Sequence, residues 1–195
     1  MHARINYVDI KPESFEAVDQ FWRDVVSNYD KLVQGVFLRD GDTPHTLSVV
    51  VFETEQAMID NTENQLGSVV RQAASHRLNE PELHPLEVCA HVEGNAGDIG
   101  CARVANVTLK VDQMQRVIDN WAPEVGKYAR QSGFRGGMMC ADRNTGEVRS
   151  VTYWASHADI EENESSGAFE QAVGPYEDAI EVAPERTYWN ARVIV

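Results

Sequence analysis

The chain contains two copies of one unit. Residues 3–33 align without a gap with residues 102–132, and the match continues through the rest of each half. A repeat that spans roughly half of the chain is too long for a solenoid period and has the size of a small domain. Matched pairs along the two copies are Arg4 and Arg103, Trp22 and Trp121, Tyr29 and Tyr128, Ser48 and Ser150, Asn61 and Asn163, and Pro81 and Pro184.

The repeat predicts the division of the chain into domains. We expect a first repeat at 1–93, a linker at 94–101 and a second repeat at 102–195. The linker interpretation follows from the glycine-rich, polar composition of this segment. Function must then be sought in one unit, and in how the two copies differ.

Each repeat shows the order strand, helix, strand, strand, helix, strand. Apolar residues that recur every three or four positions indicate an amphipathic helix, and alternating or β-branched runs indicate strands. In the first repeat we expect a strand at 4–10, a helix over 15–32, strands at 34–39 and 46–53, a helical region over 55–78 with a break near 61–64, and a strand at 86–92.

Local signals in the second repeat add three expectations. Asn144 to Gly146 has the composition of a hairpin turn. Ser156 precedes the second helical region and is a candidate helix cap. Pro123 lies inside the first helix of this repeat, where proline removes a hydrogen bond, so we expect a kink or a break there.

The order of elements predicts an α+β fold. A β-α-β-β-α-β unit, the ferredoxin-like arrangement, forms a four-stranded antiparallel sheet with both helices on one face. The other face needs a cover, and the second copy can supply it, so that the two sheets pack together within one chain. Fusion raises the effective concentration of the two halves. The sequence leaves open whether this internal pair associates further as a homodimer.

Composition excludes several classes of function. The formal net charge of −14 disfavours nucleic acids and anionic membranes as partners, because both attract basic surfaces. No apolar run is long enough for a membrane span, and the N-terminus lacks the core of a signal peptide, so we expect a cytoplasmic protein. Cys89, Cys101 and Cys140 lie far apart and show no metal-ligand spacing, which predicts reduced thiols and no metal site.

The halves resemble a known family. The features that carry the resemblance are the tryptophan-containing first helices, the strand-to-helix passages 50–57 and 152–158, and the closing strands 87–92 and 190–195. Together they resemble the dimeric α/β-barrel superfamily, and in particular tandem antibiotic biosynthesis monooxygenase (ABM) domains. The resemblance implies oxidation of a phenolic, quinol or polyketide-like compound by oxygen, with no metal or flavin cofactor. The same superfamily includes stress-responsive barrels, haem enzymes and proteins of no known activity, so the fold alone implies little about function.

One subgroup of the family degrades haem, and the resemblance can be tested against it. That subgroup uses an asparagine on the first strand, a tryptophan on the second helix and a histidine further along that helix. Asn106 fills the first position. The other two positions fall on Asn163 and near Val173, or on Asn61 and Arg71 in the first copy. Because both copies lack two of the three residues, haem is the less favoured ligand.

Differences between the copies place the candidate site in the second one. Its third strand, 150–154, has gained a hydroxyl, a phenol and an indole relative to 48–52, and its second strand has gained methionines. An apolar pocket with a few polar groups and adaptable methionine walls suits an aromatic ligand. The matched helix aromatics also have a plain interpretation as core residues. Candidate substrate-binding residues are Tyr153, Trp154, Trp121, Tyr128 and Met139.

Two side chains are candidates for catalysis. A cofactor-free oxygenase needs a group that holds the substrate anion and a base that takes its proton. Asn106 can donate a hydrogen bond to a substrate oxygen, and His157 has the titration range of a base, although a histidine at a helix start can equally be an exposed surface residue. The leading hypothesis is a monooxygenase-like enzyme, and the alternative is a barrel that binds a small apolar ligand, or serves a stress response, without catalysis.

Overall fold

The structure is a computed structural model that describes residues 1–195, and its chain divides into two compact units. The first unit comprises Met1–Glu87 and Trp189–Val195, and the second comprises Val88–Tyr188. The sequence repeat places the division in the segment between the copies, whereas the structure places it inside two strands. These are β4 (Glu82–Glu93) and β8 (Ile180–Ile194), and each contributes residues to both units.

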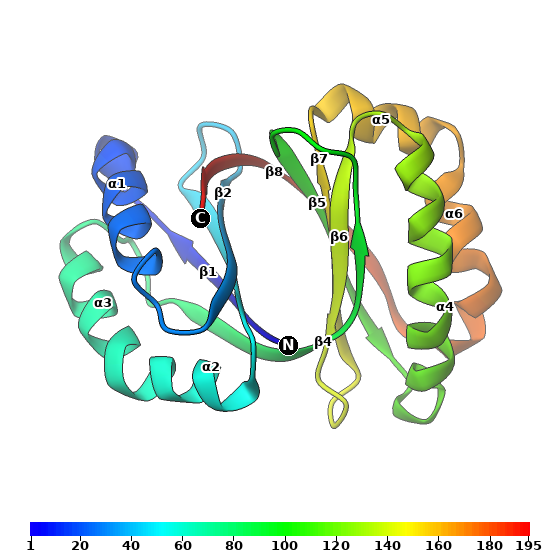
Figure 1. Ribbon diagram of the computed structural model, residues 1–195, viewed down its shortest axis with the longest axis horizontal. Helices are drawn as coiled ribbons and strands as arrows, with labels where there is room; N and C mark the ends of the chain where they lie inside the picture. Colours follow the sequence, from blue (N-terminus) through cyan, green and yellow to red (C-terminus); the bar gives the residue numbers. More distant parts are fainter. The chain divides into compact units, whose positions relative to one another are not determined.

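The first unit is a mixed α/β layer. Its β1 pairs antiparallel with β3 and with β4, and β2 pairs antiparallel with β3 and β8. Its helices lie along one side of these strands (Figure 1). The elements are β1 (His2–Asp9), α1 (Phe15–Val26), β2 (Leu32–Arg39), β3 (His45–Phe52), α2 (Glu55–Asn61), the π turn η2 (Thr62–Leu66) and α3 (Gly67–Gln72), with 3-10 turns η1 (Pro12–Ser14) and η3 (Ala73–Ser75).

The first helix is shorter than its apolar pattern predicts. It buries Val18 and Val26 and ends at Val26, while Tyr29 remains buried in the turn that follows. Lys31 then adopts a left-handed backbone with φ of 53°, a conformation that ends a helical path and starts a new direction. The apolar periodicity therefore continues past the helix, because the turn packs on the same core.

The break predicted in the second helical region is confirmed. The α2 helix ends at Asn61, and the π turn η2 separates it from α3. A π turn widens the backbone locally and often occurs at functional sites. Here it carries Asn61 and Thr62, whose side-chain oxygens accept hydrogen bonds from Arg4.

The second unit repeats the plan. Its β7 lies between β5 and β6, antiparallel to both, and its helices lie along one side of these strands (Figure 1). The elements are β5 (Cys101–Leu109), α4 (Met114–Gly126), β6 (Phe134–Ala141), β7 (Glu147–Trp154), α5 (His157–Ser165) and α6 (Ala168–Val173), with 3-10 turns η4 (Val111–Gln113), η5 (Lys127–Arg130) and η6 (Gly174–Ala179).

Two of the three local predictions in this unit are confirmed, and the third is contradicted as far as a break is concerned. Gly146 has a φ of 82° in the turn between β6 and β7, and the Ser156 side chain accepts a hydrogen bond from the backbone of Asp159 at 3.3 Å. The break expected at Pro123 is absent, because α4 continues to Gly126. Proline removes only one backbone donor, and the buried apolar face of α4 holds the helix on the sheet.

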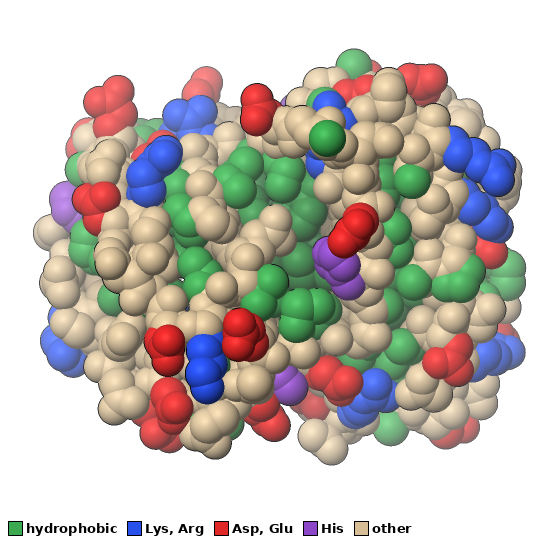
Figure 2. Space-filling model, viewed as in Figure 1, with side chains coloured by type: hydrophobic (Ala, Val, Ile, Leu, Met, Phe, Trp, Pro, Cys, Tyr) green, Lys and Arg blue, Asp and Glu red, His purple; other side chains and the backbone are tan.

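The hydrogen-bonded strand order is β1-β3-β2-β8-β5-β7-β6-β4, which returns to β1 as a closed barrel. This order confirms the α+β fold of duplicated ferredoxin-like units predicted from the repeat. None of the helices has the length and apolar character that crossing a membrane requires. Acidic and basic side chains are dispersed over the face shown in Figure 2, as expected for a solvated surface.

Candidate functional site

Each unit has a cavity between its helices and the helix-covered face of its strands. We call the one in the first unit the first cavity and the one in the second unit the second cavity. Their volumes are about 90 and about 80 Å³. One water needs about 10–15 Å³ of such space, so both can admit a small ligand. Because the volumes are alike, the lining decides what each cavity can bind.

The linings correspond position by position. Both cavities contain the matched arginine, tryptophan, tyrosine and serine of the repeat, contributed by the first strand, the first helix, the turn after it and the third strand. Several positions differ in polarity or size, and five of them bear on the ligand. In the order first cavity to second cavity they are Asn6 and Ala105, Val25 and Glu124, Val50 and Thr152, Ala73 and Tyr176, and Arg77 and Ile180.

Arg103 of β5 is the charged anchor of the second cavity. Its side chain is only 3% exposed. The Nη1 atom donates to Asn163 Oδ1 at 3.0 Å and reaches Glu164 Oε1 at 3.4 Å. Asn163 is held in turn, since its Nδ2 donates to Gln131 Oε1 at 3.0 Å. A buried cation with a carboxylate and an amide partner is both neutralised and fixed in position.

Aromatic rings surround this guanidinium. Its carbon lies 5.1 Å from the centre of the Phe169 ring and 5.8 Å from the centres of the Tyr128 and Trp154 rings. These distances are in the range of cation–π attraction. At this end of the second cavity, aromatic rings therefore surround the positive charge of Arg103.

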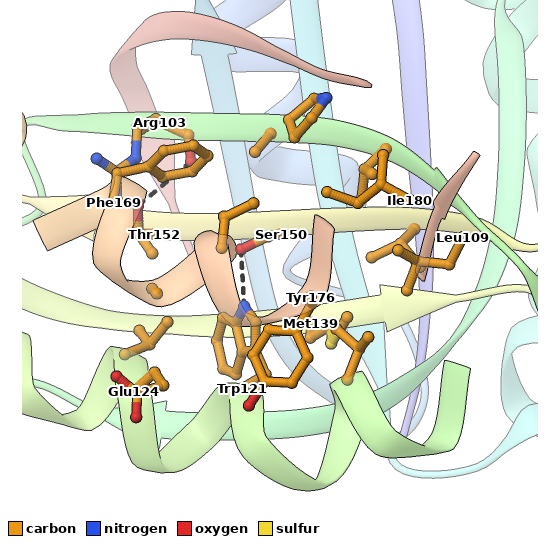
Figure 3. Close-up of a pocket in the computed structure, with 18 of the residues that line it drawn as sticks. Arg103, Leu109, Trp121, Glu124, Met139, Ser150, Thr152, Phe169, Tyr176 and Ile180 are labelled. Atoms are coloured by element: carbon orange, nitrogen blue, oxygen red, sulfur yellow. Dashed lines mark hydrogen bonds between the residues drawn. The ribbon is translucent and has the colours of Figure 1, made fainter. Parts of the chain in front are cut away.

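Trp121 of α4 forms one wall of the second cavity. Its indole Nε1 donates to Ser150 Oγ of β7 at 3.0 Å, the dashed contact in Figure 3. Tyr176 lines the same cavity. The hydrogen bond satisfies the one polar atom of the indole, so its ring presents an apolar face to a ligand.

Tyr128 is a donor in this site and not a base. Its hydroxyl donates to the backbone oxygen of Ala168 at 3.3 Å. Burial raises the pKa of Tyr128, and the nearby Arg103 opposes part of that rise. The phenol therefore stays protonated at neutral pH, because a raised pKa favours the neutral form.

Glu124 is the acidic residue in the lining of the second cavity. It lies on α4, one turn before Tyr128, at the end of the cavity where Arg103 sits (Figure 3). Lys127 pairs with its carboxylate. A carboxylate that is partly exposed and reaches an apolar cavity can take a proton from a ligand.

The structure brings three of the predicted site residues together. Trp121, Tyr128 and Met139 line the second cavity. Trp154 lies beneath this lining, fully buried against Tyr128 and Phe134. Its indole donates to Thr152 Oγ1 at 3.0 Å, so Trp154 supports the wall without forming it.

Asn106, Tyr153 and His157 are not among the residues that line the second cavity. Successive side chains of a strand point to opposite faces. Ala105 on β5 lines the cavity, which puts Asn106 on the other face, and the same alternation separates Tyr153 from the lining residue Thr152. Burial raises the pKa of Tyr153, and its buried hydroxyl has no hydrogen-bond partner. The catalytic roles of Asn106 and His157, which begins α5, remain predictions.

Sequence reasoning missed the polar residues that do line the second cavity. These include Arg103, Glu124 and Ser150. A signal for two of them was present, because Arg103 and Ser150 are polar residues in apolar strands and both recur in the first copy. A polar residue retained twice in such a strand indicates a buried partner on the same face.

Comparisons with known proteins give the fold and leave the activity open. No family model and no curated protein matches the sequence. A putative monooxygenase from Lactobacillus acidophilus NCFM is similar over 100% of this chain and 95% of its own, with a TM-score of 0.76 and 10% identity. An anthrone oxidase-like protein is similar over 100% of this chain and 92% of its own, with a TM-score of 0.72 and 14% identity.

A third solved structure connects the fold to the family named above. An uncharacterised ferredoxin fold protein from Listeria monocytogenes, described as related to antibiotic biosynthesis monooxygenases, covers 98% of this chain and 95% of its own, with a TM-score of 0.59 and 8% identity. At these identities the likeness establishes the fold alone. The resemblance of the sequence to tandem ABM-like domains is therefore confirmed for the fold.

Proposed function

We propose that the chain is a monooxygenase-like protein that binds a small aromatic, quinol or polyketide-like compound in the second cavity and oxidises it with dioxygen. The observation that carries the proposal is the lining of this cavity. It is mostly apolar and aromatic, and its two charged residues, Arg103 and Glu124, lie at one end. A mostly apolar pocket with a few convergent polar groups is the usual form of a small-molecule site.

The two charged residues have complementary roles in this proposal. Glu164 lies beside Arg103 at 3.4 Å and is shared with Arg186, and Glu124 adds a further carboxylate to the lining, so in this proposal the cavity favours a neutral ligand. Glu124 takes the proton of an enol or phenol, and negative charge develops on the ligand oxygen near the guanidinium. Stabilisation that appears only as charge develops accelerates the reaction and does not merely tighten binding.

For an anthrone-like ligand the chemistry balances without a cofactor. A methylene carbon conjugated with an enolisable carbonyl loses both of its hydrogens and becomes a second carbonyl. That carbon keeps one oxygen atom of dioxygen, and the other atom leaves as water with the two hydrogens. The ligand supplies all the electrons, and the protein supplies a base, a cation and an apolar enclosure.

Ligand binding without catalysis is the second candidate, and one observation favours it. Asn106 and His157, the side chains to which the sequence assigned the chemistry, do not line the second cavity. Haem is less favoured than either candidate, since no histidine lines the first or the second cavity.

Oxygen uptake by the metal-free protein tests the proposal against hydroquinones, catechols and anthrones. We expect uptake above the uncatalysed rate and a fall of about 100-fold in Glu124→Gln, the usual size of a lost general base. Val25→Gln places the same amide at the matching position of the first cavity and should leave uptake unchanged. If Glu124→Gln also leaves it unchanged, Glu124 is not the base. Saturable binding of these compounds with no uptake would establish the non-catalytic alternative.

A further inference from the structure

The first cavity contains a buried cation with no acidic partner. Arg4 is 2% exposed. Its Nη1 donates to Asn61 Oδ1 at 2.8 Å and to Thr62 Oγ1 at 3.0 Å, and both acceptors are neutral. Its Nε is buried without a hydrogen-bond partner. Arginine keeps its charge in proteins, so the first cavity holds an uncompensated positive charge.

The second copy shows what is missing. Thr62 of the first copy corresponds to Glu164 of the second, since each follows a matched asparagine. Glu164 is the carboxylate that pairs with Arg103. Each guanidinium carbon also lies 5.8 Å from the centre of its matched tyrosine ring. The charges around the two arginines still differ, because Glu164 also pairs with Arg186 at 3.5 Å, where the first copy has the neutral Leu83. The carboxylate beside the buried arginine is thus present in the second copy and absent from the first.

Aromatic contacts do not remove this difference. The Arg4 guanidinium carbon lies 5.6 Å from the centre of the Phe52 ring, a distance at which cation–π attraction offsets part of the desolvation cost. A ring face carries no net charge, however, and burying an unpaired ion is strongly unfavourable. An anion at Arg4 would relieve that cost.

A second unpaired atom indicates the shape of the ligand. Asn6 follows Arg4 by two positions, so both side chains point to the same face of β1, about 7 Å apart along the strand. Asn6 Nδ2 donates to Ser48 Oγ at 3.2 Å, while Asn6 Oδ1 is buried without a donor. One face of β1 thus carries a donor without an acceptor, Arg4 Nε, and an acceptor without a donor, Asn6 Oδ1.

The walls between these polar atoms suit a ring. Trp22 and Phe37 stack with their centres 5.4 Å apart and both line the first cavity. Arg77 adds a second guanidinium to the lining, but Glu80 already pairs with it at 2.5 Å. An apolar cavity of about 150 Å³ binds benzene, so side chains of the first cavity, with its volume of about 90 Å³, must move to admit even one ring.

We propose that the first cavity is a second binding site, selective for a single-ring aromatic acid that carries a hydroxyl group. The carboxylate binds Arg4, the ring lies along Trp22 and Phe37, and the hydroxyl donates to Asn6 Oδ1. This site lies in the other copy from the proposed oxidation site and takes an anionic ligand in place of a neutral one. It does not rest on the proposed function.

Calorimetric titration of the full chain tests the proposal with 4-hydroxybenzoate and its neutral amide, 4-hydroxybenzamide. We expect one equivalent of the acid to bind, and the amide to bind about tenfold more weakly or worse, because an unpaired buried charge dominates the difference. Thr62→Glu gives Arg4 the carboxylate that Arg103 has, and should weaken binding of the acid by a similar factor. Thr62→Val removes the hydroxyl without adding charge and should retain binding.

The mirror variant tests whether the other residues of the first cavity are needed. Glu164→Thr removes the carboxylate beside Arg103 but leaves Ala105 in place of Asn6 and Glu124 in place of Val25, so this variant should still bind a single equivalent of the acid. Arg4→Met should abolish the original equivalent, and circular dichroism establishes that each variant is folded. Equal affinity for the acid and the amide, or unchanged affinity for the acid in Thr62→Glu or Arg4→Met, would overturn the proposal. So would a Glu164→Thr protein that binds a second equivalent of the acid as tightly as the first.

Discussion

The two cavities are built from corresponding residues of two copies of one unit, yet they treat the same buried arginine differently. In the second copy Arg103 has a carboxylate partner in Glu164. In the first copy Arg4 has only neutral acceptors, Asn61 and Thr62. A duplicated scaffold can thus retain its packing while one position beside a buried arginine changes from a neutral hydroxyl to a carboxylate.

The polar atoms near the third strand differ in the same way. In the second cavity Ser150 accepts from the indole of Trp121, whereas in the first cavity Ser48 accepts from Asn6. The matched serines therefore hold different side chains: Ser150 orients the Trp121 indole, and Ser48 holds the Asn6 amide. Three measurements can break or sharpen this comparison.

Truncation of the largest buried ring should have the largest effect. Trp154 and Phe52 occupy matched positions and are both fully buried, and replacing such a ring by alanine costs about 3–5 kcal/mol of the free energy of unfolding. Trp154→Ala should cost more than Phe52→Ala, because it also removes the donor to Thr152 Oγ1. Urea unfolding followed by circular dichroism measures both. A smaller loss of the free energy of unfolding in Trp154→Ala than in Phe52→Ala would contradict this expectation.

Removal of the matched serine hydroxyls should have a moderate effect. Ser150→Ala breaks the hydrogen bond to the Trp121 indole and should cost about 1 kcal/mol. It should also shift tryptophan fluorescence, because the indole loses its fixed partner. Ser48→Ala should cost a similar amount without the shift, since Ser48 pairs with Asn6. An identical emission change in both variants would contradict the difference between the two walls.

The third effect is absent at neutral pH and should appear only at alkaline pH. Burial raises the pKa of the Cys101 thiol from 9.0 to about 11, so the folded state holds the proton more tightly than the unfolded state. The resulting stability is present in full below pH 9 and is lost as the pH rises towards 11. Urea unfolding between pH 8 and pH 11 should show a steeper decline in the wild type than in Cys101→Ala. The buried tyrosines of both copies add the same background to each protein, so equal slopes would exclude the thiol.

Much of the fold could be predicted because it depends on local patterns. Apolar periodicity indicated α1 and α4, turn chemistry located Gly146, and the cap at Ser156 follows from its position before a helix. The break after Asn61 was also visible in the sequence. Pro123 shows the limit of such signals, since tertiary packing of α4 outweighs one missing hydrogen bond.

The candidate site was harder to predict because strands have a period of two. Both faces of β5 are rich in apolar residues, so the sequence did not reveal that Ala105 faces the cavity while Asn106 faces away from it. A shift of one position exchanges every side chain between the two faces. The choice of Asn106 over its neighbours therefore had no local basis.

By itself the sequence determined the duplication and the order of elements in each copy, and hence the ferredoxin-like unit. The reason is that apolar residues recur with the period of a helix or of a strand along each segment. Only the tertiary structure decided that the end of β8 joins the first unit, and that Thr62 or Glu164 meets a buried arginine from a distant strand. Such contacts depend on distance in space between residues far apart in the chain. For that reason the partner of each buried arginine emerged from the fold and not from the pattern of residues.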